Sequence, residues 1–192
     1  MGAPAFLGLG SNLGDREAAL EDALDRLAAH GFRVTRRSSL WLTEPVGGPP
    51  QGWFLNAAAE GETALRPEAL LDACLSTERE MGRVRVERNG PRTIDLDILF
   101  FGDERLDTPG LVIPHPRLHE RRFVLEPLAE IAPGFVHPVL GLTVRDLDRT
   151  TAARQPIPDT VQGVIVMDVD PAGPARLARV REGGVEEIRF GW

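Results

Sequence analysis

TIDLDILFF, residues 93–101, is the stretch of the sequence that decides the fold. Its β-branched and aromatic residues favour a strand. Side chains alternate between the two faces of a strand, so Asp95 and Asp97 point to the same side, about 7 Å apart. Three aliphatic residues point to the opposite side, into the expected core: Ile94, Leu96 and Ile98.

The segments before this stretch predict three strands and two helices, so residues 93–101 are the fourth strand. They predict a buried strand over 5–9, a helix that follows the turn at 10–15 and ends near residue 29, strands over 33–42 and 54–63, and a helix that opens at Pro67. The order strand–helix–strand–strand–helix–strand is that of a split βαβ unit. We therefore expect an α+β fold of the ferredoxin-like class, a βαββαβ sandwich.

The segments after this stretch predict helices over 121–131 and 143–149. Residues 154–160 have the composition of a linker. Strand-like segments follow the linker at 163–169, 176–181 and 185–190. We expect a main domain over residues 1–153 and, over residues 154–192, a linker with a C-terminal β-hairpin-like extension.

The composition limits the chemistry that the chain can perform. It has 192 residues, 42% of them apolar, which suffices for one domain with its own core. All 22 basic residues are Arg, and the chain contains neither Lys nor Tyr. The missing Lys excludes a Schiff base and a P-loop lysine, and the missing Tyr excludes a tyrosine acid or nucleophile. A phosphate site in this chain must therefore use Arg, backbone amides or metal ions.

The charge balance and the cysteine count indicate partners and location. With 22 basic and 29 acidic residues, the formal net charge is −7, so we expect no nucleic-acid partner. The single cysteine, Cys74, excludes an intrachain disulfide and fits a reducing compartment. The N-terminus carries no secretory signal and no run of 18 apolar residues occurs, so we expect no membrane partner and a cytoplasmic location.

The two carboxylates of the fourth strand are a candidate metal site. Asp95 and Asp97 repel each other unless a cation lies beside them. Mg²⁺ prefers oxygen ligands and is the natural partner of such a pair. A solvated strand face is the alternative interpretation of the same two residues.

The segment just before these carboxylates, RVRVERNGPR at 83–92, locally inverts the charge of the chain. Four Arg and one Glu give it a local charge of +3. The forked guanidinium group of Arg suits phosphate oxygens. Beside the Asp pair, this segment matches the needs of a nucleoside triphosphate with bound Mg²⁺, whereas by itself it also fits a solvated loop.

Two further segments indicate ligand contacts. Phe54 and Asn56 share one strand face, and a ring beside a carboxamide suits a flat heterocycle with hydrogen-bonding edges. A core Phe and a turn Asn are the alternative. His115 stands between two prolines and near Arg121, which is consistent with a second phosphate contact or with a structural histidine.

Five segments of the chain occur together in the order of one family. They are LGLGSNLGDR (7–16), TEPVGGPPQGWFLNA (43–57), MGRVR (81–85), RNGPRTIDLDILFFG (88–102) and VIPHPRLHERRFVLEPLAEIAP (112–133). The chain thereby resembles the 6-hydroxymethyl-7,8-dihydropterin pyrophosphokinase family of folate biosynthesis over residues 5–150. The resemblance implies Mg²⁺-dependent transfer of pyrophosphate from ATP to the pterin hydroxymethyl group, with release of AMP, by the domain over 1–153.

The resemblance also assigns roles to single residues. It implies that two Mg²⁺ ions bind at Asp95 and Asp97. The residues implied to bind ATP are Glu78, Arg83, Arg85, Arg92, Ile98, His115 and Arg121, with Ile98 against the adenine. Those implied to bind the pterin, stacked between two Phe rings, are Thr43, Pro45, Val46, Phe54, Asn56, Asp95 and Phe123. Those implied to be catalytic are Arg83, Arg85, Arg92 and Asp97.

The chain departs from some members of that family at two positions. Asn89 stands where they carry Trp, so no ring closes over the site from there. Phe54 stands where they use Tyr, so stacking is kept while a hydroxyl contact is lost.

Two other classes of function compete with this one. An RNA-binding ferredoxin-like module is disfavoured by the net charge of −7 and by the Asp pair on the candidate face. A metal-dependent nucleotide hydrolase would use the same charged residues and would release AMP without the pterin. We expect a monomer, with a dimer through residues 154–192 as the alternative.

Overall fold

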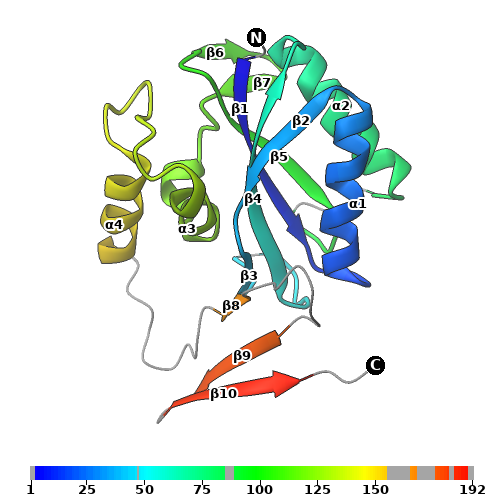
Figure 1. The fold of residues 1–192 in the computed structure, drawn as a ribbon, viewed down its shortest axis with the longest axis vertical. Coiled ribbons are helices and arrows are strands. Elements are labelled where there is room, and N and C mark those ends of the chain that lie inside the picture. Colours follow the sequence, from blue (N-terminus) through cyan, green and yellow to red (C-terminus); the bar gives the residue numbers. More distant parts are fainter. Residues whose placement is uncertain are drawn as a thin grey trace.

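The computed structural model describes residues 3–46, 48–84, 89–154, 165–167, 176–181 and 184–189. Figure 1 shows a central sheet with helices on both sides. The strands of this sheet are β1 (Ala3–Ser11), β2 (Phe32–Arg37), β3 (Leu40–Thr43), β4 (Phe54–Thr63), β5 (Asp95–Phe101) and β8 (Ile165–Met167). Every strand pair in the described residues is antiparallel. The expected mixture of helices and strands is therefore confirmed, and the structure adds that the sheet is antiparallel.

The first strand lies at the centre of the sheet, between β4 and β5. The strand order is β5-β1-β4-β3-β8, and β2 also pairs with β4. In the register between β1 and β5, Gly10 lies opposite Asp95 and Gly8 opposite Asp97. The two carboxylates of β5 therefore have no side chain beside them on β1.

Two helices, α1 (Arg16–Ala29) and α2 (Pro67–Glu80), cover one face of the sheet. Asp15 caps α1 by accepting a hydrogen bond from Ala18 N at 3.1 Å. Pro67 opens α2, as predicted. The alternation predicted for β4 and β5 is also confirmed, because this core contains Leu55, Ala57, Ala59, Ile94, Leu96 and Ile98.

The opposite face is covered by α3 (Arg122–Ile131), against which α4 (Val144–Arg154) packs. Thr143 caps α4, since its Oγ1 accepts from Asp146 N at 3.1 Å and donates to Asp146 Oδ2 at 2.6 Å. The helix predicted over 143–149 runs on to Arg154. This layer has a second core, which includes Phe6, Ala58, Phe100, Leu125, Leu128 and Val144.

One predicted strand, over 33–42, is two strands in the structure. Ser38 N donates to Ala58 O at 2.9 Å, and Ser38 Oγ accepts from Ala58 N at 2.9 Å. The serine hydroxyl thus takes the place of a backbone acceptor, and the strand is interrupted between β2 and β3. Both halves still pair with β4.

The remaining elements are short. The hairpin of β6 (Leu106–Thr108) and β7 (Leu111–Ile113) follows β5, and the 3₁₀ turn η1 (Leu118–Glu120) leads into α3. Beyond α4, β8 pairs with β3, and β9 (Arg176–Arg181) pairs with β10 (Gly184–Arg189). The predicted linker over 154–160 lies outside the described residues except for Arg154.

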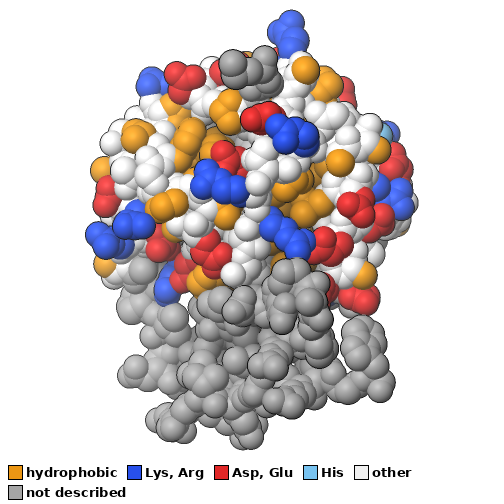
Figure 2. Space-filling model, viewed as in Figure 1, with side chains coloured by type: hydrophobic (Ala, Val, Ile, Leu, Met, Phe, Trp, Pro, Cys, Tyr) orange, Lys and Arg blue, Asp and Glu red, His pale blue; other side chains and the backbone are white. Residues whose placement is uncertain are grey.

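The surface carries charges of both signs. On the face that Figure 2 displays, basic and acidic side chains stand next to one another. Two cross-strand ion pairs join β2 to β4, Arg33–Glu62 at 2.5 Å and Arg36–Glu60 at 2.6 Å. Within the described part of the chain, no helix is long and apolar enough to cross a membrane.

Candidate active site

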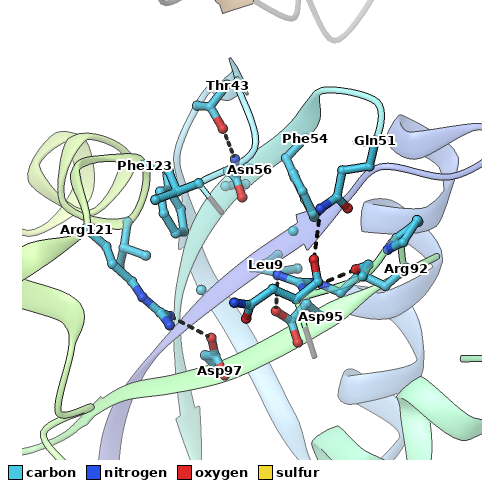
Figure 3. Close-up of a pocket in the computed structure, with 18 of the residues that line it drawn as sticks. Leu9, Thr43, Gln51, Phe54, Asn56, Arg92, Asp95, Asp97, Arg121 and Phe123 are labelled. Atoms are coloured by element: carbon cyan, nitrogen blue, oxygen red, sulfur yellow. Dashed lines mark hydrogen bonds and ion pairs between the residues drawn. The ribbon is translucent and has the colours of Figure 1, made fainter. Parts of the chain in front are cut away.

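A cavity of about 1220 Å³ lies on the α3 side of the sheet, where β1, β4 and β5 meet η1 and α3. Figure 3 shows that its side chains come from strands, loops and α3. The lining combines acidic, basic and aromatic groups, among them Asp95, Asp97, Arg83, Arg92, Arg117, Arg121, Arg122, Phe54, Phe123 and His115. A ligand in this cavity would meet charge at one side and rings at another.

The floor of the cavity is made by β1, whose sequence LGLG alternates large side chains with none. Leu7 and Leu9 lie in the core with α1 and α2, which leaves Gly8 and Gly10 on the cavity side. A Cβ atom on Gly10 would lie only 2.9 Å from Asn56 Oδ1. Glycine at this position therefore keeps room between the carboxylates and Asn56.

Two arginines hold Asp95. Its Oδ1 lies 2.6 Å from Arg83 Nη1, and its Oδ2 lies 2.9 Å from Arg92 Nη2. Arg83 also pairs with Glu78, whose Oε1 accepts from Leu96 N at 2.9 Å. Because Glu78 is buried and tied to the backbone of β5, it fixes Arg83 from behind the cavity wall.

Asp97 has a weaker partner than Asp95. Its Oδ2 lies 3.7 Å from Arg121 Nη1 (Figure 3). Burial and, after it, repulsion by Asp95 raise the pKa of Asp97 to about 6, although Arg121 and Arg92 act in the opposite direction. Asp97 is therefore short of positive charge, which a cation between the two carboxylates would supply.

The donor set at this point suits Mg²⁺, because Asp95 and Asp97 offer only oxygen ligands. The described residues contain no group of three or more His, Cys, Asp or Glu that could hold a metal ion. A metal ion bound to the two carboxylates would therefore complete its coordination with oxygens of a ligand or of water.

His115 is neutral in this site. Burial and, after it, the charge of Arg121 lower the pKa of His115 to about 4. Its Nδ1 accepts from Arg117 N at 3.1 Å, which assigns the ring proton to Nε2. Its backbone N donates to Leu99 O at 3.0 Å and anchors the residue beside the edge of β5. The ring can thus donate one hydrogen bond to a ligand without adding charge.

Two rings flank one carboxamide at the other side of the cavity. Figure 3 places Asn56 between Phe54 and Phe123. A guanidinium group lies over each ring, with Arg92 Cζ 4.8 Å from the centroid of Phe54 and Arg121 Cζ 5.8 Å from that of Phe123. The rings are therefore in contact with the same arginines that hold the carboxylates.

Some polar groups around the cavity are held by hydrogen bonds, and others have no hydrogen-bond partner. Asn56 Nδ2 donates to Thr43 Oγ1 at 2.7 Å, which fixes the plane of the carboxamide. Arg92 Nε and Thr93 Oγ1 are buried without a hydrogen-bond partner in the described structure. Each of them is a buried donor that the described structure leaves unpaired, at a cost in stability.

The cavity brings together most of the residues identified from the sequence. Those that line it are Thr43, Val46, Phe54, Asn56, Arg83, Arg92, Asp95, Asp97, His115, Arg121 and Phe123. Glu78 lies behind its wall, and Pro45 is not among the lining residues. Ile98 lies in the core with α1 and α2, because strand alternation turns it away from Asp97, so its side chain does not reach an adenine in this cavity. Arg85 lies outside the described residues.

Several residues that line or support the cavity could not be identified from the sequence: Gly8, Gly10, Asn12, Gln51, Arg117 and Arg122. The LGLG alternation is a signal for the two glycines, since it leaves one strand face bare. Asn12 is typical of a turn, yet its side chain bonds to Gln51 and to Arg92. Such contacts join distant segments and leave no local pattern.

The comparisons with known proteins agree with one another. Residues 6–133 match the family described as 7,8-dihydro-6-hydroxymethylpterin-pyrophosphokinase (HPPK). The 2-amino-4-hydroxy-6-hydroxymethyldihydropteridine pyrophosphokinase of Methylorubrum extorquens is 50% identical over 143 residues, which cover 74% of this chain and 89% of that protein. The protein of the same name from Bacillus subtilis is 51% identical over 128 residues, which cover 66% and 77%.

The fold has relatives among solved structures. A crystal structure of wild-type Plasmodium falciparum HPPK-DHPS with STZ-DHP matches 81% of this chain with a TM-score of 0.65 and 18% identity. The match spans 44% of the length of that chain. At this identity the likeness concerns the fold alone.

Proposed function

The chain belongs to the 7,8-dihydro-6-hydroxymethylpterin-pyrophosphokinase family, and from that premise we propose that it transfers pyrophosphate from ATP to 6-hydroxymethyl-7,8-dihydropterin in folate biosynthesis. The observation that carries the proposal is a single cavity in which Asp95 and Asp97 face three arginines on one side and two Phe rings on the other. The arginines suit a triphosphate and the rings suit a pterin.

The proposed reaction is an in-line displacement at the β-phosphorus of ATP. The hydroxymethyl oxygen forms a bond to this phosphorus while the bond to the bridging oxygen of AMP breaks, and the hydroxyl proton leaves. Asp97 is the group assigned to take that proton, because it is a carboxylate that lines the cavity. Positioning of the two substrates supplies most of the rate enhancement in such transfers.

The arginines hold the phosphates in this proposal. Arg92 and Arg121 reach the cavity from opposite sides of the Asp pair, and Arg83 is held ready by Glu78. A bound triphosphate would replace the carboxylates as their partner. We also propose Arg85 as a phosphate ligand, an assignment that rests only on the resemblance to the family.

Asp95 and Asp97 are the proposed holders of Mg²⁺, with two ions expected. When bound, Mg²⁺ supplies charge neutralisation at the triphosphate. The raised pKa of Asp97 and the all-oxygen donor set support this assignment.

Phe54 and Phe123 are the proposed stacking partners of the pterin, and Asn56, oriented by Thr43, is its hydrogen-bonding partner. Pro45 and Val46, in the loop that follows Thr43, are further proposed pterin contacts. For adenine, the main chain of Ile98 is the proposed contact, because β5 is the edge strand on that side of the sheet.

The proposal also covers the fold class, the location and the oligomeric state of the protein. The order β5-β1-β4 followed by β2 and β3 supports a ferredoxin-like class for the core over residues 1–153. The lone Cys74 supports a cytoplasmic location. We keep the monomer as the proposed state, with residues 154–192 as an extension.

An AMP-release assay with and without 6-hydroxymethyl-7,8-dihydropterin tests the proposed function. We expect AMP only when ATP, Mg²⁺ and the pterin are all present, and we expect chelation by EDTA to stop its release. AMP release that does not depend on the pterin would instead indicate a nucleotide hydrolase. Asp72→Asn, an exposed carboxylate on α2, is the matched control for variants of the Asp pair.

A further inference from the structure

A second cavity, of about 360 Å³, lies next to the cavity of Asp95 and Asp97, which is called the main cavity below. It is bounded by the β6–β7 hairpin, by the segment over 114–119 and by the loop between α3 and α4. Of the described residues, His115 alone belongs to the linings of both cavities. The volume of the second cavity lies in the range of small-ligand sites.

The lining of the second cavity is mostly apolar. Its aliphatic side chains are those of Leu106, Val112, Ile113, Val139 and Leu140, with two prolines beside them. Three of these apolar side chains are exposed: Val112, Val139 and Leu140. Arg105 and Asp107 bring one charge of each sign to the same cavity. The lining therefore favours a flat, uncharged ring, which would remove exposed apolar surface from water.

The loop that forms one wall of this cavity is held by its own hydrogen bonds. His137 N donates to Leu142 O at 2.8 Å, and Gly141 N donates to His137 O at 2.9 Å. The Nδ1 atom of His137 accepts from Val139 N and from Leu140 N, each at 3.2 Å. The shape of this wall is thus set by the protein itself, before a ligand binds.

His137 brings an unused hydrogen-bond donor to the cavity. The residue is only 4% exposed, and its Nδ1 is an acceptor, so the ring proton lies on Nε2. Burial and, after it, the charge of His119 lower the pKa of His137, which keeps the ring neutral. Phe100 and His119 contact the ring edge-on, with centroids 5.4 and 6.4 Å away. No described residue accepts a hydrogen bond from Nε2, so an acceptor on a ligand would be its partner.

We propose that the second cavity is a ligand site separate from the main cavity, and that it takes an uncharged planar aromatic lactam or amide whose carbonyl oxygen accepts a hydrogen bond from His137 Nε2. The aliphatic walls hold the ring, and the histidine selects for the carbonyl group. This site goes beyond the proposed function and does not depend on it.

Oxindole and indole are the two probes that test this site. They have the same fused rings, but oxindole carries a lactam carbonyl group that indole lacks. The chain has four histidines, so ¹⁵N–¹H NMR of the imidazole rings follows each of them separately. We expect oxindole to shift the signals of His137 and His119 with a Kd on the order of 1 mM, as for a ligand of ten heavy atoms. His30, on the opposite side of the sheet after α1, should not shift.

Indole should bind about fivefold more weakly than oxindole, as for the loss of one hydrogen bond. The titrations are made with saturating 6-hydroxymethylpterin, so that the rings of the main cavity are not open to the probes. We expect the pterin to leave the Kd of oxindole unchanged.

Three variants separate the hydrogen bond from the shape of the cavity. His137→Asn keeps an acceptor for the two loop N–H groups and removes the Nε2 donor, so the preference for oxindole over indole should disappear, with His119 as the reporter. Val112→Phe fills part of the cavity and should weaken both probes by about tenfold or more. Val136→Phe lies in the same loop but outside the lining and is the matched control, which should leave both Kd values unchanged.

Three results would overturn the inference. They are an oxindole shift confined to His115, competition between oxindole and the pterin, and an unchanged preference for oxindole in His137→Asn. The first two would place the probe in the main cavity, and the third would remove the role of the Nε2 donor. The AMP-release assay is a separate measurement, so a failure of the proposed function would leave the binding results as they are.

Discussion

Asp97 occupies a position where burial and Asp95 disfavour its charge and raise its pKa to about 6. We expect Asp97→Asn to lower AMP release by on the order of 100-fold or more, because the group that we propose to hold a cation and to take the proton is lost. At pH 7 the same change should stabilise the ligand-free protein. With 38% of the side chain exposed, solvent screening limits the gain to about 1 kcal/mol.

The sign of this stability effect depends on pH. A carboxyl group whose pKa is raised in the folded state destabilises the fold where it is ionised, above about pH 6, and not below its ordinary pKa of 3.8. Thermal unfolding should therefore show the gain at pH 7 and lose most of it near pH 4.5. Asp95→Asn is the contrasting variant, since it weakens two arginine pairs and should lower stability. An Asp97→Asn protein that is less stable at pH 7 would contradict this account.

The activity should follow the protonation of Asp97 as well. We expect kcat/KM for ATP to fall as pH decreases through about 6, because the protonated carboxyl group no longer attracts a cation. His115 cannot cause this decrease, since its pKa is lowered to about 4 and the ring stays neutral throughout the range. A pH profile of kcat/KM between pH 5 and 8 measures the effect. If His115→Gln removed the acidic limb, the assignment to Asp97 would be wrong.

At the scale of elements, the glycines of β1 are what opens the cavity floor. Gly10→Ala would place a Cβ atom 2.9 Å from Asn56 Oδ1. The carboxamide of Asn56 would have to rotate, which would weaken its hydrogen bond to Thr43 Oγ1. We expect KM for the pterin to rise by about tenfold, the effect of roughly one lost hydrogen bond. Thermal unfolding should change little, because the neighbour that must move is a side chain at a cavity.

Substitutions at two other glycines are controls for Gly10→Ala. A Cβ atom on Gly134 would meet no other part of the described chain within 4 Å, so Gly134→Ala should leave both KM and stability unchanged. At Gly61 a Cβ atom would lie 2.4 Å from Phe32 Cζ and 2.8 Å from Arg33 O, so Gly61→Ala should destabilise the fold by about 1–3 kcal/mol. An unchanged KM in Gly10→Ala would remove Asn56 from the proposed pterin site.

The elements could be predicted where one local pattern determines them. The alternation in β4 and β5 places Leu55 and Leu96 in the core as expected. The break between β2 and β3 could not be predicted, because it depends on a hydroxyl of Ser38 that bonds to Ala58 across the sheet. The same limit holds for the site. Asp95 and Asp97 follow from strand alternation, whereas the bond from Asn12 to Arg92 joins residues 80 positions apart.

At the scale of the whole molecule, the cavity belongs to the part of the chain before α4. Its lining residues end at Val124, in α3. The next helix, α4, contributes Val144 and Leu147 to the core on which α3 rests, so it is needed for stability. The segments beyond it reach the sheet only through β8, among the described residues, and β8 pairs with Leu40–Leu42 of β3.

Removal of the residues after Arg154 tests this division. We expect the shortened chain to retain pterin-dependent AMP release within about twofold, because no lining residue is lost. Its unfolding temperature should fall by roughly 2–8 °C, the equivalent of about 1–2 kcal/mol, since the backbone bonds between β3 and β8 are exchanged for bonds to water. Size-exclusion chromatography with light scattering decides the remaining role of the extension. An unchanged number of chains per particle removes the dimer through residues 154–192. A fall from two chains to one, with reduced activity, would make the extension part of a subunit interface and would place part of the site's support in the second copy.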